Sequence, residues 1–191
     1  LNGINADFGL DPSKSPLPGY SSSLNADCED AIADGVVVIG AVGNMNCYMV
    51  PQYNPDGSQH QDWDNYVWFT NQTPSFRYFC RGSSPNCAQG VVSVGNLSSY
   101  GNFRRATSSN YGPNIDVFAP GSEIVSCFGK PGVIVDSDGN TLNIGYTDTK
   151  YSGDNYFYPL NGTSMASPQV AGIAACLATN KERFTNSDVL G

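Results

Sequence analysis

The most informative eight residues of this chain are Asn161-Gly162-Thr163-Ser164-Met165-Ala166-Ser167-Pro168. They precede an apolar, alanine-rich stretch that is predicted to be a helix over residues 170–178. A serine at a helix N-terminus lies where free backbone N–H groups and the positive end of the helix dipole converge. Such groups can hold the oxyanion of a tetrahedral intermediate, so the pattern indicates that Ser164 is a nucleophile. The alternative is a capped core helix that happens to carry a serine.

The residues around this serine favour close packing. Gly162 lets the backbone approach a ligand closely. Pro168 is expected near the first turn of the helix, where a missing N–H costs least. Small side chains then predict that the helix packs tightly in a core; they are Ala166, Ala171, Gly172, Ala174 and Ala175.

The segment before residue 44 has the pattern of an α/β protein. Residues 21–34 predict a helix with Gly35 as its C-cap, and the continuous apolar run 36–41 is typical of a parallel strand buried on both faces. A helix followed by a buried strand indicates an α/β fold with a mainly parallel sheet. The helix face is predicted to consist of Leu24, Cys28, Ala31 and Ile32. Further strands are predicted at 4–9, 91–94, 115–118 and 123–127, with a hairpin over 133–144.

Composition narrows the classes of function. The 191 residues carry a net charge of −8 and no basic cluster beyond Arg104-Arg105, which argues against a nucleic-acid partner. No apolar run approaches the roughly 20 residues that a membrane span needs. Asn71-Gln72-Thr73 and Asn96-Leu97-Ser98 are glycosylation sequons, which matter if the chain is secreted by a eukaryote.

The six cysteines do not suggest a zinc site, because no C-x2-C pair is present. Cys80 and Cys87 are close enough in sequence to form a disulfide, and free thiols are the alternative. Cys28, Cys127 and Cys176 lie in apolar patterns and are predicted to be buried.

Residues 161–172, which read NGTSMASPQVAG, resemble the active-site serine motif of the subtilisin family, the subtilases. The resemblance implies that Ser164 is the nucleophile of a serine endopeptidase. One departure is Gln169, where the family usually has histidine. Residues 35–44, GVVVIGAVGN, resemble the buried strand that ends in the family's oxyanion-hole asparagine. Asn44 would then donate its side-chain amide to the oxyanion alongside the Ser164 N–H; a turn residue after Gly43 is the alternative.

Two further segments resemble subtilases. Residues 108–121 resemble the structural S-x-x-G-P…D-V-x-A-P-G stretch, and residues 4–9 resemble the I-N-x-S-x-G strand that pairs with a peptide substrate. Asp7 replaces the usual serine of that strand. The substrate-binding residues expected from the resemblance are Asp7, Phe8, Gly9, Gly43 and Thr163.

The family's other two catalytic motifs, D-[ST]-G and H-G-T-H, do not occur in these 191 residues. The single histidine, His60, has unrelated neighbours and is interpreted as a surface loop residue. Two interpretations stay open. In one, the aspartate and histidine lie on a segment outside this chain; in the other, the chain is a catalytically inactive structural or binding module of a larger assembly.

The resemblance therefore implies a subtilisin-like three-layer α/β domain of which residues 1–191 form the C-terminal portion, with insertions at about 45–86 and 128–157. Its partners would be a polypeptide substrate and the missing N-terminal part of the protease. No metal site is assigned, although the alternating carboxylates of residues 136–140 make calcium a candidate ligand. Secretion is favoured by the resemblance, with viral or intracellular settings as alternatives.

Overall fold

The computed structural model of the chain describes residues 19–60, 63, 66–68, 77–79, 82–99, 103–128, 132–135, 141–144, 156–179, 185 and 189. Within these residues the elements are α2 (Ser22–Ala33), β1 (Ile39–Ala41), β2 (Tyr66–Trp68), β3 (Arg77–Phe79), β4 (Val92–Leu97), β5 (Val117–Pro120), β6 (Ile124–Phe128), β7 (Gly132–Val135), β8 (Thr141–Ile144), β9 (Tyr156–Leu160) and α3 (Thr163–Ala178).

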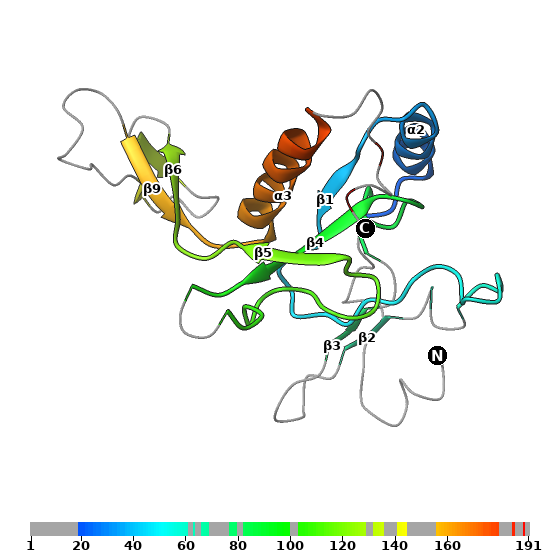
Figure 1. Cartoon of the computed structure of the whole chain (residues 1–191). Helices are drawn as coiled ribbons and strands as arrows, with labels where there is room; N and C mark the ends of the chain where they lie inside the picture. The colour runs from blue at the N-terminus through cyan, green and yellow to red at the C-terminus, as the bar shows by residue number, and fades with distance from the viewer. Residues whose placement is uncertain are drawn as a thin grey trace.

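A parallel sheet in the order β1-β4-β5 is the centre of the fold. Ile39 of β1 lies opposite Val92 of β4, and Val94 of β4 lies opposite Val117 of β5. α3 contacts all three strands and lies across the sheet (Figure 1). The predicted α/β fold with a parallel sheet is confirmed. Because the strands are parallel, their carboxyl ends meet at one edge, where ligands of open α/β sheets bind.

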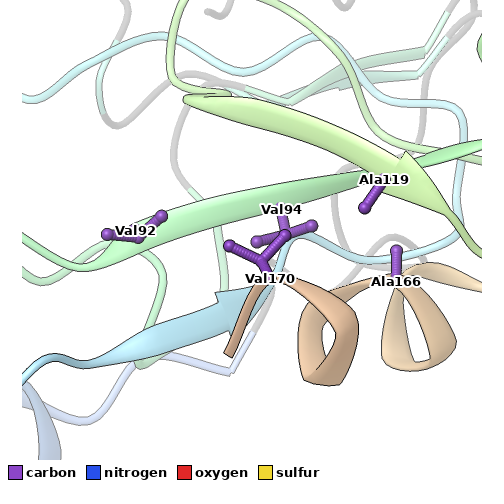
Figure 2. Close-up of a cluster of buried hydrophobic side chains, with 5 residues drawn as sticks. All are labelled: Val92, Val94, Ala119, Ala166 and Val170. Atoms are coloured by element: carbon purple, nitrogen blue, oxygen red, sulfur yellow. The ribbon is translucent and has the colours of Figure 1, made fainter. Parts of the chain in front are cut away.

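The buried core between α3 and the sheet consists of valine and alanine side chains. Figure 2 shows Val94 of β4 beside Val170 of α3, and Ala119 of β5 near Ala166 of α3. The buried residues of α3 recur every three or four positions, which is the period of one helix face. The alanines on that face let the helix axis approach the strands closely. The buried set on α3 is Thr163, Ala166, Val170 and Ala174.

α3 begins earlier than predicted, and this changes the place of Pro168. The helix starts at Thr163, so Pro168 is its sixth residue rather than part of its first turn. At this position the proline ring replaces the N–H that would donate to the Ser164 carbonyl. The prediction that Pro168 falls near the first turn was therefore wrong by one turn.

α2 is capped at both ends as the sequence predicts. The Ser21 hydroxyl accepts from the Leu24 N–H at 3.3 Å. At the other end Gly35 has φ +92°, and its N–H donates to the Ile32 carbonyl while the Val36 N–H donates to the Ala31 carbonyl. These two bonds form a Schellman motif, which only glycine adopts without strain at this position.

The same motif explains why β1 is shorter than the apolar run 36–41. Val36 is the residue that closes the helix end, and it is 53% exposed. Leu24, predicted to face the core, is also exposed, and Asn25 is the buried residue of α2 instead. The Asn25 amide donates to the Cys87 sulfur at 3.3 Å, so the helix packs on the segment that leads into β4.

The antiparallel pair β6–β9 delivers the chain to the start of α3. Ile124 lies opposite Leu160, so the end of β9 meets the beginning of β6. Ala119 and Pro120, predicted to separate two strands, instead belong to β5. Pro120 is tolerated because β5 lies at the edge of the sheet. Figure 1 shows β6 and β9 extending from that edge, to the left of α3.

Two further pairs of antiparallel strands lie among the described residues. β2 pairs with β3, and β7 pairs with β8 as the hairpin predicted over residues 133–144. The turn at 136–140 and the predicted strand at 4–9 lie outside the described residues. In the part of the chain that the structure describes, no helix is long and apolar enough to cross a membrane.

The cysteines differ from expectation. Cys87 is a free, buried thiol, so it forms no disulfide with Cys80 in this structure. Cys127 and Cys176 were predicted to be buried but are exposed, because an apolar local pattern does not reveal whether another segment covers it. Asn96, which begins one of the sequons named above, is only 1% exposed.

Candidate active site

Gly162 forms the tight turn that leads into α3. It is the N-cap, with φ +153° and ψ 169°, a region that is essentially restricted to glycine. A Cβ at this position would lie 3.1 Å from Asn44 Nδ2 and 3.4 Å from Asn44 Oδ1. The glycine therefore serves two purposes, because it permits the turn and lets the Asn44 side chain lie against the helix start.

Ser164 is the second residue of α3, and it is exposed. The first N–H groups of a helix have no acceptor within the helix. The Met165 N–H bonds back to the Gly162 carbonyl at 3.0 Å, whereas no described residue accepts from the Ser164 N–H. No acidic side chain lies in the first turn to neutralise the positive end of the dipole. The Ser164 N–H is thus a free donor at a positive helix end.

Asn44 follows β1 after a tight turn at Gly43, which has φ +102°. Its Oδ1 accepts a hydrogen bond of 2.9 Å from the Thr163 N–H. An N–H donor requires an acceptor, so this contact fixes the oxygen of the amide toward Thr163. Nδ2 is left as a donor beside Gly162, on an exposed side chain.

A second hydrogen bond joins the same two segments, and here the loop after β1 supplies the donor. The Gly43 N–H donates to the Thr163 hydroxyl at 3.1 Å, and the Thr163 side chain is fully buried. Thr163 was predicted to contact substrate; in this structure its side chain contacts the loop that carries Asn44. These two bonds hold the end of the β1 segment and the start of α3 together.

The turn between β5 and β6 is hydrogen-bonded to the residues just before α3. The Gly162 N–H donates to the Gly121 carbonyl at 2.7 Å, and the Glu123 N–H donates to Asn161 Oδ1 at 2.6 Å. A Cβ on Gly121 would lie 2.5 Å from the Gly162 carbonyl oxygen, so this turn also requires glycine. The Gln169 amide donates to the Pro120 carbonyl and ties β5 to the second turn of α3.

The other residues considered from the sequence are Asp7, Phe8, Gly9 and His60. Asp7, Phe8 and Gly9 lie outside the described residues, as does the calcium candidate at 136–140, so these hypotheses stay predictions. His60 is half-buried in a loop, where its N–H donates to the Gln52 carbonyl at 2.8 Å. Among the described residues, no group of three or more His, Cys, Asp or Glu side chains is arranged to hold a metal ion.

A cavity of about 240 Å³ lies elsewhere, lined by residues 51–53 and 86–91 together with Trp63, Asn114 and Asp116. It is at the amino-terminal edge of the strands, away from Ser164. Burial raises the pKa of the Asp116 carboxyl, and a hydrogen bond of 2.7 Å from the Ser93 N–H partly offsets this. Asp116 keeps part of its surface exposed, so water screens much of the effect.

The chain belongs to the subtilase family, whose model matches residues 5–190. It is 31% identical to proteinase R of Parengyodontium album over 175 residues, which are 92% of this chain and 30% of that protein. It is 43% identical to an extracellular protease of Xanthomonas campestris pv. campestris over 95 residues, covering 49% of this chain and 13% of that protein.

A solved structure supports the same fold. A protease from Pseudoalteromonas arctica PAMC 21717 superimposes with a TM-score of 0.56 at 23% sequence identity, covering 99% of this chain and 48% of that chain. The chain spans 26% to 30% of the length of the first curated relatives that it matches.

Several residues support the candidate site through distant contacts that no short sequence pattern indicates. Asn110, Gly121 and Asn96 support the loops around Ser164 through bonds to distant segments. The S-x-x-G-P…A-P-G resemblance marks residues 108–121 as structural, but it does not indicate what Asn110 holds.

Proposed function

We propose that this chain is the C-terminal portion of the catalytic domain of a serine endopeptidase that hydrolyses polypeptides through an acyl-enzyme at Ser164. The observation that carries the proposal is the bond from the Thr163 N–H to Asn44 Oδ1, at 2.9 Å. With its oxygen so engaged, the Asn44 amide offers Nδ2 beside the helix start, where the Ser164 N–H is also free to donate.

The proposed reaction has two steps. Ser164 Oγ attacks the scissile carbonyl carbon while a histidine takes the hydroxyl proton, and the oxyanion is held by Asn44 Nδ2 and the Ser164 N–H. The C–N bond then breaks as the histidine gives its proton to the leaving amine, and the acyl group stays on Ser164. Water, deprotonated by the same histidine, then releases the acyl group as a carboxylic acid.

The histidine and its orienting aspartate are proposed to come from the missing N-terminal part of the same protease. The absence of both motifs from the sequence supports this, because Ser164 is a weak nucleophile without a base. The coverage of related proteins supports it too, since the chain spans 48% of the Pseudoalteromonas protease chain.

Exposed apolar side chains on α3 indicate where that part would dock. Ile173 and Leu177 lie three and seven residues after the buried Val170, so they continue its stripe along the helix. Yet they are 60% and 52% exposed. An apolar stripe that runs beyond its covering strands supports a further covering segment, and we infer that the N-terminal part of the domain is that segment.

A catalytically inactive module of a larger assembly is the second candidate, because such a module would also lack the two motifs. A fluorophosphonate probe applied to the complete folded protein distinguishes the two. Under the proposal the wild-type protein is labelled and the Ser164→Ala variant is not. A folded wild-type protein that stays unlabelled would rule out the peptidase and leave the module.

Secretion is proposed as the setting of the complete protein. It is supported by the family and by the name of the Xanthomonas relative, an extracellular protease. Recovery of the protein from the culture medium of its source cells is the expected result, and its confinement to the cell lysate would contradict the proposal.

A further inference from the structure

The loop that carries Asn44 is held from outside the sheet. It runs from Val42 to Cys47, and Gly43 and Asn46 have positive φ values of +102° and +53°. After the Val42 N–H, which donates to the Val94 carbonyl at 3.2 Å, the loop leaves the ladder of β1, so its remaining N–H and C=O groups need other partners. One buried side chain, that of Asn110, is the partner of three of these groups.

The Asn110 side chain is 1% exposed and makes three hydrogen bonds to this loop. Its Nδ2 donates to the Val42 carbonyl at 2.7 Å. Its Oδ1 accepts from the Met45 N–H at 3.1 Å and from the Cys47 N–H at 3.0 Å. The Asn110 backbone N–H adds a fourth bond, to the Gly43 carbonyl at 3.0 Å.

These four bonds bracket Asn44 on both sides, at positions 42, 43, 45 and 47. We propose that Asn110 is a positioning residue that sets the loop conformation in which Asn44 faces the start of α3. This inference rests on the proposed function, because it assigns Asn110 a role through the Asn44 amide. Asn110 itself bonds neither Ser164 nor Thr163 in the structure.

The three hydrogen bonds of the Asn110 side chain require an amide, because only an amide offers both an acceptor oxygen and a donor N–H. Two N–H groups need an oxygen, and one carbonyl needs an N–H, so asparagine satisfies all three with one side chain. The substitution Asn110→Asp would keep an acceptor for Met45 and Cys47, but would set a carboxylate oxygen against the Val42 carbonyl oxygen. The loop must then shift, with nearly unchanged side-chain volume.

The effect on catalysis has an upper limit. If Asn110 acts only through Asn44, Asn110→Asp cannot lower kcat by more than Asn44→Ala does, which is about 10²–10³-fold for one oxyanion donor. A misplacement of about 1 Å is enough for roughly 10²-fold. We therefore expect Asn110→Asp to lower kcat of the complete protease by about 10–100-fold with little change in KM.

A double-mutant cycle separates positioning from general stability. In the Asn44→Ala background, Asn110→Asp should produce no further loss of kcat, because the amide that it positions is gone. A further loss of the same size in that background would overturn the proposal. Asn54→Asp is the matched control and should leave kcat unchanged, since among the described residues the Asn54 side chain bonds only to Ser58 of its own loop.

Hydrogen exchange tests the inference without activity. In the complete protein, Asn110→Asp should speed amide exchange at Thr163, whose acceptor is Asn44 Oδ1, while exchange at Val94 in β4 stays as in wild type. Unchanged protection at Thr163 would overturn the proposal. If wild-type protein has no peptidase activity, the proposed function fails, and this exchange measurement still decides whether Asn110 positions Asn44.

Discussion

Asn44 and Thr163 lie 119 residues apart in the sequence, yet the Asn44 side-chain oxygen accepts a 2.9 Å hydrogen bond from the Thr163 N–H. This bond joins the loop after β1 to the first residue of α3. The backbone conformation of Gly162 makes the contact fit, because any side chain at 162 would meet the Asn44 amide.

Gly162→Ala is expected to destabilise the protein by about 1–3 kcal/mol, because alanine is strained at φ +153° and its Cβ would press on Asn44. Urea unfolding measures the change. Gly172→Ala is the control, since a Cβ there meets nothing within 4 Å and the site is in a helix interior. The control should gain about 0.5–1 kcal/mol. Equal effects of the two variants would contradict the strain at Gly162.

Asn44→Ala is expected to lower kcat of the complete protease by about 10²–10³-fold, a scale established for an oxyanion donor in subtilisin itself rather than derived from this structure. KM should change little, because the donor acts on charge that develops in the transition state. Steady-state kinetics on a peptide substrate gives both constants. Asn54→Ala, which removes an amide from a separate loop, should match wild type. A rise in KM alone would mean that Asn44 binds substrate instead.

Asp116→Asn should change how stability depends on pH. Because burial raises the folded-state pKa of Asp116, the unfolded chain gives up this proton at a lower pH than the folded protein. Asp116 therefore costs stability above its raised pKa, and this cost disappears in acid. Asparagine keeps an acceptor for the Ser93 N–H, so the variant should gain stability over wild type as pH rises from acid to neutral. Urea midpoints across that range measure it.

Asp56→Asn gives the opposite sign and serves as a control. Hydrogen bonds from the Ser58 hydroxyl and N–H lower the pKa of Asp56, so its ionised form favours the folded state. That contribution is present at neutral pH and is lost as pH falls through the lowered pKa. The variant should be slightly less stable than wild type at neutral pH and equal to it in strong acid. The same trend for both variants would refute the assignment.

Ile173→Glu and Leu177→Glu are expected to prevent the N-terminal part of the domain from docking on α3. Each would place a charge in an apolar contact that the proposal buries. Fluorophosphonate labelling of Ser164 in the complete protein should fall to background, while circular dichroism retains the helix signal. Val125→Glu is the control, because Val125 is 62% exposed on β6 and lies off this stripe. Normal labelling of the α3 variants would place the partner elsewhere.

The candidate-site residues that the sequence predicts are those that a short local motif encodes. Ser164 follows from the serine motif, and Asn44 from the strand that precedes it. Their placement on a parallel sheet with a helix across it agrees with the alternation of helix and buried strand. The predictions that failed concern burial, which depends on other segments of the chain. Cys127 and Cys176 lie in apolar patterns, but no described neighbour covers them.

Distance along the chain explains the other omissions. The Thr163 hydroxyl bonds Gly43 across 120 residues, and Asn110 bonds Val42 across 68. Neither partner can be recognised from a short window, since an asparagine in a turn and a buried structural asparagine look alike in sequence. Pro168 was misplaced because the apolar pattern that predicts the helix begins at residue 170, whereas the helix starts at Thr163, directly after the N-cap Gly162.

The burial of Asn96 has a consequence for producing the protein. Its side chain is enclosed between Ser122 and the Gly121 turn, and its N–H is bonded to the Ser109 hydroxyl. A sugar chain attached to Asn96 before folding would keep β4 from pairing with β5. A eukaryotic host that secretes the chain adds glycans to nascent chains at such sequons, so only chains that escape modification there could fold. A bacterial host removes that competition between glycosylation and folding.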